Sequence, residues 1–458
     1  MIELKQMPIS RREFIAAAAA PALLPAAATR RPNFIVIVAD DLGCHDLGCL
    51  GATDLKTPHI DALAASGARF VNWYSNAPVC APARSAIMTG RFPIRAGVPN
   101  NGPALGPQHK TIASLLKPLG YSTACIGKWH LGSTPETDPN AHGFDYYYGF
   151  HSGCVDYYSH RYYWGGANQV NYHDLWRNRT EIFEDGQYLT ERIAAEAKQF
   201  IAQNKANPFF LYAPFNAPHY PMHAPEKYMK RFAGLDPERR TYAAMISALD
   251  DGVGEIMAAV KQAGLLESTM VVFIGDNGAT VEKRAGLNQD FAKAGNNGPF
   301  RGFKFSLFDG GMHVPGIMSW PGTIPARQQI RELAMSMDIL PTICKAAGAS
   351  LPEGYTVNGS DILPVATSQA KSPHPAIFWA QGGQLATRRG PWKLVVGGIL
   401  FNRTPDSGRM TGDDAVFLSN LDQDPGETTN LRHKHPEIVD ELQTSLNTWF
   451  ATLRPEKD

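Results

Sequence analysis

The chain has 458 residues, 44% of them hydrophobic and 19% charged, and its 43 basic residues balance its 43 acidic ones. This length exceeds what one small core uses, so we expect a large principal domain with a smaller one attached. The balanced charge creates no overall field that would attract nucleic acid or an anionic membrane, so any anion site must be local.

The first thirty residues are typical of a targeting segment. Arg11 and Arg12 precede an alanine-rich apolar run that ends in small residues at positions 26–28. This arrangement resembles a twin-arginine export signal over residues 1–30. An ordinary secretion signal is the alternative, although such signals usually need a more hydrophobic run than alanine supplies. The run is about fifteen residues long and a bilayer span needs roughly twenty, so we expect a periplasmic or secreted protein with no stable membrane span.

Four short apolar runs end in side chains able to hold a metal ion or an anion. The runs lack polar alternation, as do strands that are buried on both faces. Residues 34–39 lead to Asp40 and Asp41, residues 122–127 to Lys128 and His130, residues 208–213 to His219, and residues 270–275 to Asp276 and Asn277. Ligands bind beyond the carboxyl ends of strands in parallel sheets, so we expect these side chains to meet there. After any single run, an aspartate is as readily a helix cap or a turn residue.

Helical patterns between these runs predict an α/β fold. Residues 189–201, for example, place their apolar side chains on one stripe that can cover a sheet. Because such segments alternate with the apolar runs, we expect a large, mostly parallel or mixed sheet flanked by helices.

A polar stretch that ends in proline, residues 367–373, is typical of a link between folded units. We therefore expect a catalytic domain over residues 31–372 and a subdomain over residues 373–458. The subdomain contains two strand-like runs, 376–380 and 392–396, and a helical stretch, 437–453. These predict a small antiparallel sheet with one covering helix, packed on the main domain.

Cys80 opens the most informative segment, Cys-Ala-Pro-Ala-Arg, which continues as Ser-Ala-Ile-Met-Thr-Gly-Arg to position 91. Taken alone, a cysteine beside a proline is a small buried hydrophobic residue in a turn. The six cysteines show no paired spacing of the kind that binds zinc. They are Cys44, Cys49, Cys80, Cys125, Cys154 and Cys344. If Cys80 is modified, five remain, so at least one is a free or intermolecular thiol; export would permit disulfides among the others.

With six further segments, the cysteine motif resembles the type I, formylglycine-dependent sulfatase family, of arylsulfatase type, within the alkaline phosphatase superfamily. These segments are residues 57–64, 127–132, 217–219, 275–278, 301–304 and 424–427. The likeness covers nearly the whole chain after the first thirty residues. The cysteine motif paired with Lys128-Trp129-His130 is its most specific part. One departure from the family pattern is His313, where many members carry an arginine. A histidine supplies less permanent charge than an arginine.

The resemblance implies an alkaline-phosphatase-like fold and a cofactor made from the chain itself. A formylglycine-generating enzyme would oxidise Cys80 to formylglycine. The implied metal ligands are Asp40, Asp41, Asp276, Asn277 and an oxygen of the modified Cys80. Carboxylate and amide oxygens, without thiolate or imidazole, suit a hard cation. Calcium is our first choice and magnesium the alternative.

The resemblance also implies roles around the sulfate group. Arg84 would hold the orientation of the formylglycine. The side chains implied to surround the sulfate are Lys128, His130, His219 and Lys304. Each of these has a plainer interpretation when taken alone, since a single lysine is most often solvated and a single histidine is most often a core or surface residue.

These roles predict a sulfuric ester hydrolase. The hydrated aldehyde at position 80 would attack sulfur, with the metal lowering the cost of ionising its hydroxyl. Lys128, Lys304 and the cation would stabilise the transferring group. His219, assisted by Lys304, would donate a proton to the leaving alcohol, and His130 would take a proton from the second hydroxyl so that sulfate leaves.

Residues 156–166 are rich in aromatic and basic side chains, which suggests a saccharide cleft with Arg161 near a second anion. A loop packed on its own domain is an equally good interpretation. We expect a sulfated saccharide or an aryl sulfate as substrate. Two alternatives are a phosphonate monoester or phosphodiester hydrolase of the same superfamily, and a noncatalytic binder of sulfated glycans if Cys80 is unmodified.

Overall fold

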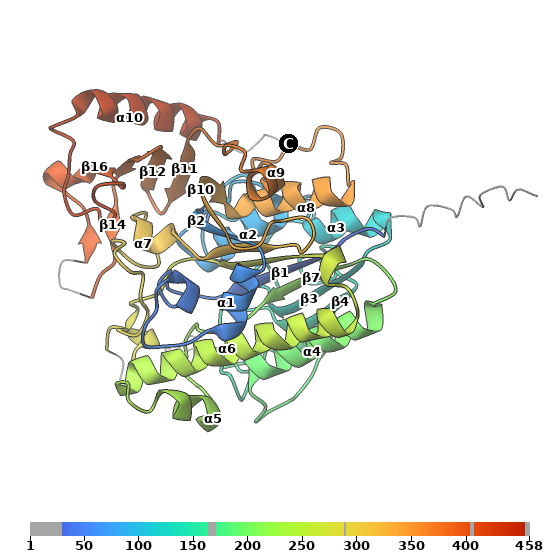
Figure 1. Ribbon diagram of the computed structural model, residues 1–458. Coiled ribbons are helices and arrows are strands. Elements are labelled where there is room, and N and C mark those ends of the chain that lie inside the picture. Colours follow the sequence, from blue (N-terminus) through green and yellow to red (C-terminus); the bar gives the residue numbers. More distant parts are fainter. Residues whose placement is uncertain (1–29, 164–170, 288–289, 404–406, 454–458) are drawn as a thin grey trace, which may run out of the picture. The chain divides into compact units, whose positions relative to one another are not determined.

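The computed structural model describes residues 30–163, 171–287, 290–403 and 407–453 (Figure 1). The expected export signal lies outside the described residues except for Arg30. Residues Pro32–Asp458 form one compact unit. Within the described ranges, every helix is too short or too polar to cross a membrane.

A sheet of ten strands forms the centre of this unit (Figure 1). In spatial order its strands are β10 (Gln328–Met335), β2 (Ala68–Tyr74), β9 (Gly316–Ser319), β8 (Thr269–Gly275), β1 (Asn33–Ala39), β7 (Phe209–Pro214), β3 (Ser122–Lys128), β4 (Tyr146–Phe150), β5 (Trp176–Arg177) and β6 (Thr180–Glu181). The central pairs are parallel, whereas β9 runs antiparallel to both of its neighbours and β5 to β4 and β6. The expected mostly parallel or mixed sheet is confirmed.

Alternate residues of β1 pack against two different layers of helices. Ile35, Ile37 and Ala39 belong to the core on one side, whereas Phe34 and Val36 belong to the core on the other. Such burial on both faces explains why the strand sequence shows no polar alternation.

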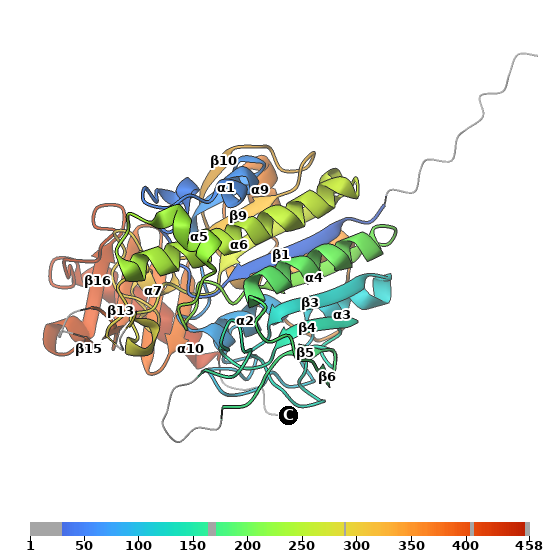
Figure 2. The ribbon, with the colours of Figure 1, turned by 90° about the horizontal axis from the view of Figure 1, so that it is seen from below.

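The first helical layer consists of α1 (Pro58–Ala65), α4 (Leu189–Asn204), α5 (Glu226–Met229) and α6 (Pro237–Gln262), which face the viewer in Figure 2. The second layer consists of α2 (Cys80–Thr89), α3 (Ile112–Leu116), α8 (Ile339–Ala347) and α9 (Leu363–Ser368). Short 3-10 helices connect these elements at Gly48–Leu50, Lys117–Leu119, Lys230–Phe232, Leu266–Ser268, Lys283–Ala285 and Ser336–Asp338.

The four strands expected to end in functional side chains are neighbours. In the sheet they occur in the order β8, β1, β7, β3, and all pair in parallel. Their carboxyl ends therefore lie side by side, which is the arrangement that the sequence predicted.

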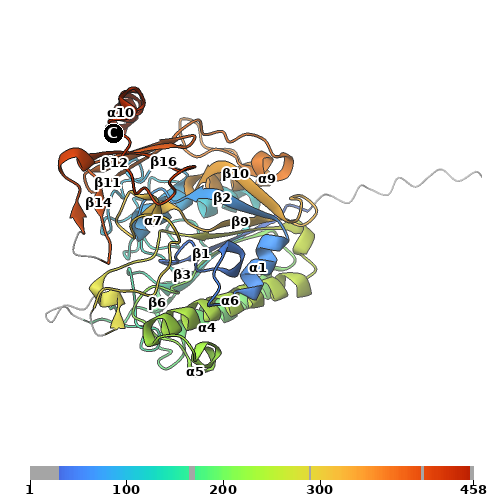
Figure 3. The same ribbon diagram turned by 60° about the vertical axis from the view of Figure 1, so that its left-hand side comes forward.

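A second, four-stranded antiparallel sheet is formed by the C-terminal part of the chain, above the short helix α7 (Asp309–Met312) in Figure 3. Its strands are β11 (Ile377–Gln381), β12 (Gln384–Arg389), β13 (Trp392–Val396) and β16 (Val416–Asn420). Helix α10 (Pro436–Ala451) covers it, and β14 (Ile399–Leu400), β15 (Gly408–Arg409) and the 3-10 turn Gly412–Ala415 lie between β13 and β16. The expected small antiparallel sheet with one covering helix is confirmed.

All six cysteines are free thiols in the structure, and five of them are buried.

Candidate active site

Asp40 and Asp41 directly follow β1, and Asp276 and Asn277 directly follow β8. A hydrogen bond links the two strand ends, because the backbone amide of Asp41 donates to the side-chain Oδ1 of Asp276 at 3.1 Å. Asp41 has a positive φ of 60°, which is rare for a non-glycine residue and turns its carboxylate next to that of Asp40. All four side chains are fully buried.

Cys80 is the first residue of α2, and every residue of this helix is buried. Its Sγ lies 3.6 Å from Oδ1 of Asp40 and 3.9 Å from Oδ1 of Asp41. The first amides of a helix have no partner within the helix, so this position favours negative charge nearby. The amide of Ala81 donates to Oδ1 of Asn101 at 3.0 Å.

Three cations face these carboxylates. The guanidinium of Arg84 donates to Oδ2 of Asp276 at 2.8 Å and lies 3.3 Å from Oδ1 of Asp40. Nζ of Lys128 lies 2.7 Å from Asp40, and Nζ of Lys304 lies 2.9 Å from Asp41. Three buried carboxylates and three buried cations therefore balance within the cluster.

The two aspartates after β1 differ in pKa. Burial alone would raise the pKa of Asp40, but Lys128, Arg84 and Lys304 outweigh burial and hold that pKa below its usual value. Burial raises the pKa of Asp41 to about 7, although Lys304 opposes this shift. The carboxylate of Asp40 is thus the better stabilised negative charge of the pair.

His219 and His130 both line the cavity that contains Cys80. Nδ1 of His219 donates to the carbonyl of Tyr220 at 2.8 Å, so its Nε2 is free to accept from Nζ of Lys304 at 3.3 Å. Burial, then Lys304 and Lys128, lower the pKa of His219 well below its usual value, and burial followed by Lys128 does the same for His130. Both imidazoles are therefore neutral in this state.

The ring of His130 has room because the facing residue is a glycine. A Cβ at Gly153 would lie 2.8 Å from Nε2 of His130. Nδ1 of His130 is buried and has no hydrogen-bond partner. An unpaired buried nitrogen is costly, so it is a position where a polar ligand would be stabilised.

A cavity of about 200 Å³ opens onto the cluster. Among its lining residues are Cys80, His130, His219 and Lys304. A second cavity of about 500 Å³ adjoins it and shares Gly102, His130, Gly153 and Tyr162 with the first. A continuous cleft therefore leads from Cys80 toward the aromatic segment.

The donor atoms around Cys80 indicate whether a metal ion would fit there. Ligand atoms of Asp40, Asp41, Cys80 and His219 lie within 4.8 Å of one another. Oδ1 of Asn277 is buried without a partner. Asp276 is not in this group, and Arg84 and two backbone amides donate hydrogen bonds to its oxygens. Oxygen donors and the orphaned amide oxygen suit a divalent cation beside Cys80.

Some residues of this site were not predicted from the sequence. Glu282 and Arg284 line the cavity of Cys80, and no motif identified them. The hydroxyl of Tyr157 lies 2.7 Å from the carbonyl of His219 and supports that loop. Of the aromatic segment, Tyr162 reaches the cleft, Arg161 is exposed at the protein surface, and residues 164–166 lie outside the described residues.

His313 is not part of the cleft. Its Nε2 donates to the carbonyl of Val71 at 2.6 Å, and its ring stacks on Tyr74 and Phe300. The position that departs from the family pattern therefore has a packing role in this chain.

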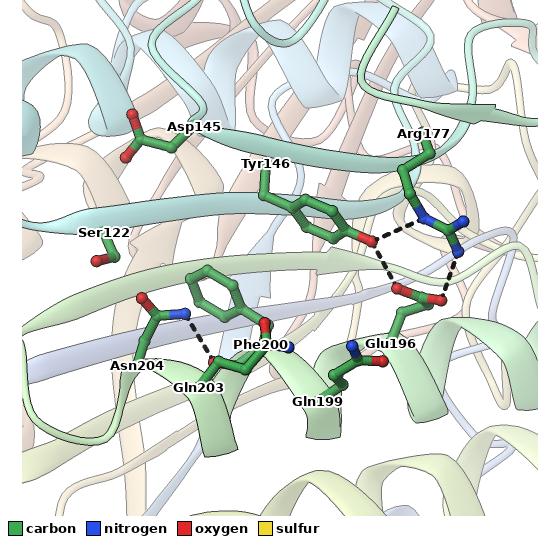
Figure 4. A pocket seen from close by; sticks show the side chains of 9 residues that line it. All are labelled: Ser122, Asp145, Tyr146, Arg177, Glu196, Gln199, Phe200, Gln203 and Asn204. Carbon is green, nitrogen blue, oxygen red and sulfur yellow. Dashed lines mark hydrogen bonds and ion pairs between the residues drawn. The ribbon is translucent and has the colours of Figure 1, made fainter. Parts of the chain in front are cut away.

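A larger cavity of about 730 Å³ lies at the other end of the strands (Figure 4). It adjoins Ser122 and Tyr146, the first residues of β3 and β4. Its charged groups are paired, since Glu196 accepts from Tyr146 at 2.6 Å and from Arg177 at 2.8 Å. It contains none of the candidate catalytic residues, so size alone does not locate the reaction.

Comparison with known proteins gives consistent results. A protein-family model described as Sulfatase matches residues 32–349. The chain is 31% identical to the steryl-sulfatase of Homo sapiens, over 93% of this chain and 89% of the relative. It is 32% identical to the N-acetylgalactosamine-6-sulfatase of Sus scrofa, over 91% of this chain and 84% of that protein.

A solved structure has the same fold and a related sequence. The crystal structure of Ps i-CgsB in complex with k-i-k-neocarrahexaose superposes with a TM-score of 0.80 and 31% sequence identity. The match covers 92% of this chain and 93% of that one.

Proposed function

The chain belongs to the sulfatase family and is a sulfuric ester hydrolase, and we propose that it removes sulfate from a sulfated saccharide through a formylglycine made from Cys80. A divalent cation, calcium rather than magnesium, would assist. The observation that carries this proposal is the position of Cys80 at the floor of a cleft between acidic and basic side chains.

The unmodified thiol of Cys80 is poorly suited to the reaction. Burial raises its pKa well above the usual value, although Lys128 and Lys304 oppose this shift. A buried thiol in its protonated form is a weak nucleophile. Oxidation by a formylglycine-generating enzyme would instead supply a hydrated aldehyde, with two hydroxyl groups on one carbon.

Asp40, Asp41 and Asn277 would hold the cation next to Cys80, and Asp276 would join them by giving up one of the hydrogen bonds that its oxygens accept from Arg84 and two backbone amides. This oxygen-rich set favours calcium. When bound, the cation would supply positive charge that lowers the pKa of a neighbouring hydroxyl. Arg84 keeps Asp276 and Asp40 in place.

Lys128 and Lys304 would stabilise the negative charge of the transferring sulfate. Both ammonium groups are buried, and each is held by one aspartate of the cluster. Charges fixed in a site that excludes water contribute more than charges in solvent, because the site does not have to reorganise during the reaction.

Lys304 and His219 together would protonate the leaving alcohol. In the structure the proton lies on Lys304, which donates to the free Nε2 of His219. Lys304 would pass its proton to Nε2 of His219, and His219 would hand that proton to the alcohol, so that the imidazole returns to its neutral form and Lys304 is left to be reprotonated. His130 is neutral and unpaired at Nδ1, which suits a base that takes up the proton released with sulfate.

The lining of the cleft favours a saccharide over a steroid. Its lining includes Ser133, His151 and Asp174 together with the rings of Tyr172 and Trp176. Rings can pack on sugar faces while polar groups bind hydroxyls, and the buried Nε2 of His151, which has no hydrogen-bond partner, offers a place for one such hydroxyl. Among the relatives, one acts by name on N-acetylgalactosamine-6-sulfate, and one solved structure holds a neocarrahexaose.

We also propose that the chain is exported through a twin-arginine signal to the periplasm or the medium, and that it divides at residues 372 and 373. Both proposals rest on the sequence of residues 1–30 and 367–373. Export in the folded state would allow Cys80 to be modified first.

Two measurements test the proposed function. The mass of the tryptic peptide that contains Cys80 should show the loss of one sulfur and two hydrogens and the gain of one oxygen. An unmodified peptide from active enzyme would contradict the proposal, and an unmodified peptide from inactive protein would favour a noncatalytic glycan binder.

The second measurement compares rates on sulfate esters with rates on phosphate diesters and phosphonate monoesters. The sulfate ester should be hydrolysed fastest, and EGTA should remove activity that added calcium restores. Faster hydrolysis of the phosphonate monoester would favour the alternative enzyme class.

A further inference from the structure

Two histidines and an aspartate converge in the segment between β4 and α4, which is coloured teal to green in Figure 2. One ligand atom from each of His160, His173 and Asp185 lies within 4.8 Å of the others. His160 is completely buried, His173 is 8% exposed, and Asp185 is at the surface. None of the three lines the cavity of Cys80.

Each histidine uses one ring nitrogen and leaves the other unpaired. Nε2 of His160 lies 3.0 Å from the carbonyl of Gln187, and Nδ1 of His173 lies 3.1 Å from Oε1 of Glu181. A carbonyl and a carboxylate only accept hydrogen bonds, so these two nitrogens carry the protons. The remaining atoms, Nδ1 of His160 and Nε2 of His173, are buried lone-pair acceptors without a partner.

This pattern is the one that metal-binding histidines show. Such a histidine donates its second ring N–H to a carbonyl or carboxylate, which fixes the tautomer and points the other nitrogen at the metal. Two buried nitrogen lone pairs in one cluster lower the stability of the fold unless a ligand binds to them.

We propose that His160, His173 and Asp185 bind a zinc ion at a second metal site, separate from the cation beside Cys80. Two imidazole nitrogens and one carboxylate oxygen are a ligand set that zinc accepts, whereas calcium prefers oxygen donors alone. Three protein ligands leave a fourth tetrahedral position for water.

The ion would tie together three separate pieces of backbone. His160 has a positive φ of 53°, and its carbonyl accepts from the amide of Asp174 at 2.9 Å. Asp185 belongs to the turn that precedes α4. Because His173 and Tyr172 also line the cavity of about 500 Å³, zinc would stiffen a wall of the substrate cleft.

Zinc binding to the full chain, treated with a chelator and then dialysed, tests the proposal. An Asp41→Asn background weakens the cation site beside Cys80 and isolates the second site. We expect one zinc per chain by isothermal titration and elemental analysis, and a higher melting temperature with zinc present, because the ion binds only the folded chain.

Two substitutions at exposed positions avoid disturbing the core. Asp185→Asn should weaken zinc binding at least about tenfold, and Glu181→Gln, which replaces the carboxylate that accepts from His173 with a neutral amide, should weaken it about 10–100-fold. Cobalt in place of zinc should give the intense visible bands of four-coordinate Co²⁺, and Asp185→Asn should reduce them.

The matched control is His433→Gln, since His433 is 71% exposed and pairs with an exposed Asp413. This control should bind zinc as the parent chain does. The proposal is overturned if the parent binds no zinc at micromolar concentrations, or if Asp185→Asn and Glu181→Gln bind it as tightly as the control.

Discussion

The structure contains two buried ionic clusters that differ in their access to a cavity. The catalytic cluster pairs Asp40, Asp41 and Asp276 with Arg84, Lys128 and Lys304, and the cavity of Cys80 opens onto it. The second cluster pairs Lys393 with Asp309 at 2.6 Å and with Glu427 at 3.1 Å. None of these last three residues lines the cleft.

The second cluster connects the two sheets. Lys393 lies on β13 of the small sheet, whereas Asp309 begins α7 beside the large one and accepts from the hydroxyl of Tyr74 at 2.7 Å. Burial raises the pKa of Glu427 to about 7, against the opposing charge of Lys393. Buried charge and a shifted pKa therefore occur at both places, so neither feature identifies a reaction site, whereas the open cavity is found at the catalytic cluster.

Cys80→Ala should have the largest effect and should distinguish the catalytic cluster from the second cluster most clearly. We expect activity to fall by about 10⁴–10⁶-fold, the scale observed when a nucleophile is removed. The melting temperature should change little, because Sγ makes only long contacts with Asp40 and Asp41. The control is Cys344→Ala, a buried cysteine of α8 that does not line the cleft. Substantial turnover by Cys80→Ala would refute the assignment.

A smaller loss of activity is expected from His219→Gln. Removing a proton donor typically costs about 10²–10⁴-fold, and the loss should be larger for a sugar alcohol than for a phenol that leaves without help. Rates on an aryl sulfate and a sugar sulfate, measured side by side, check this. The neighbouring His223→Gln, a half-exposed histidine paired with Asp156, is the control. Equal losses on both substrates would exclude His219 as the donor.

Lys393→Met should show the opposite behaviour, with a loss of stability but little loss of turnover by the folded enzyme. Breaking a buried ion pair typically costs about 3–5 kcal/mol, because Asp309 and Glu427 would lose their shared cation. Urea unfolding measures the change. Lys371→Met, at an ion pair whose lysine is 91% exposed, should leave stability nearly unchanged. If kcat falls as much as for His219→Gln, the second cluster is also catalytic.

The smallest effect concerns a histidine at the start of the C-terminal part. Burial alone would lower the pKa of His374, but the hydrogen bond and charge of Asp338 at 2.9 Å outweigh burial and raise it. A raised pKa means that the stabilisation is complete below about pH 6.5 and is lost as pH rises through the folded-state pKa.

His374→Gln should therefore lower the free energy of unfolding by about 1 kcal/mol at acidic pH and by less at pH 8. Melting temperatures of the parent and the variant across this range check it, with His433→Gln as the exposed control. A difference that grows with pH would contradict the sign of the shift.

The sequence predicted the strand ends of the site well. The runs before Asp40, Lys128, His219 and Asp276 became adjacent parallel strands, and their polar termini lie at one edge of the sheet. Predictions of this kind succeed because a strand buried on both faces must be apolar throughout. The edge strands β5 and β6 were not predicted, since two residues carry no periodic signal.

Contacts between loops that are far apart in the sequence were not predicted. Glu282 and Arg284 reach the cavity, and His160 meets His173, only because loops of irregular conformation fold back on each other. Neither apolar periodicity nor motif spacing encodes such approaches.

By itself, the sequence determined the class of fold, the residues at the ends of four strands and the chemistry that their side chains make available. Those properties follow from local patterns of apolar and polar residues. Only the tertiary structure decided which oxygen of Asp276 is engaged by Arg84, which nitrogen of each histidine is left unpaired, and which of two charged clusters opens to a cavity. These depend on burial and on partners far away in the chain, and burial exists only after folding.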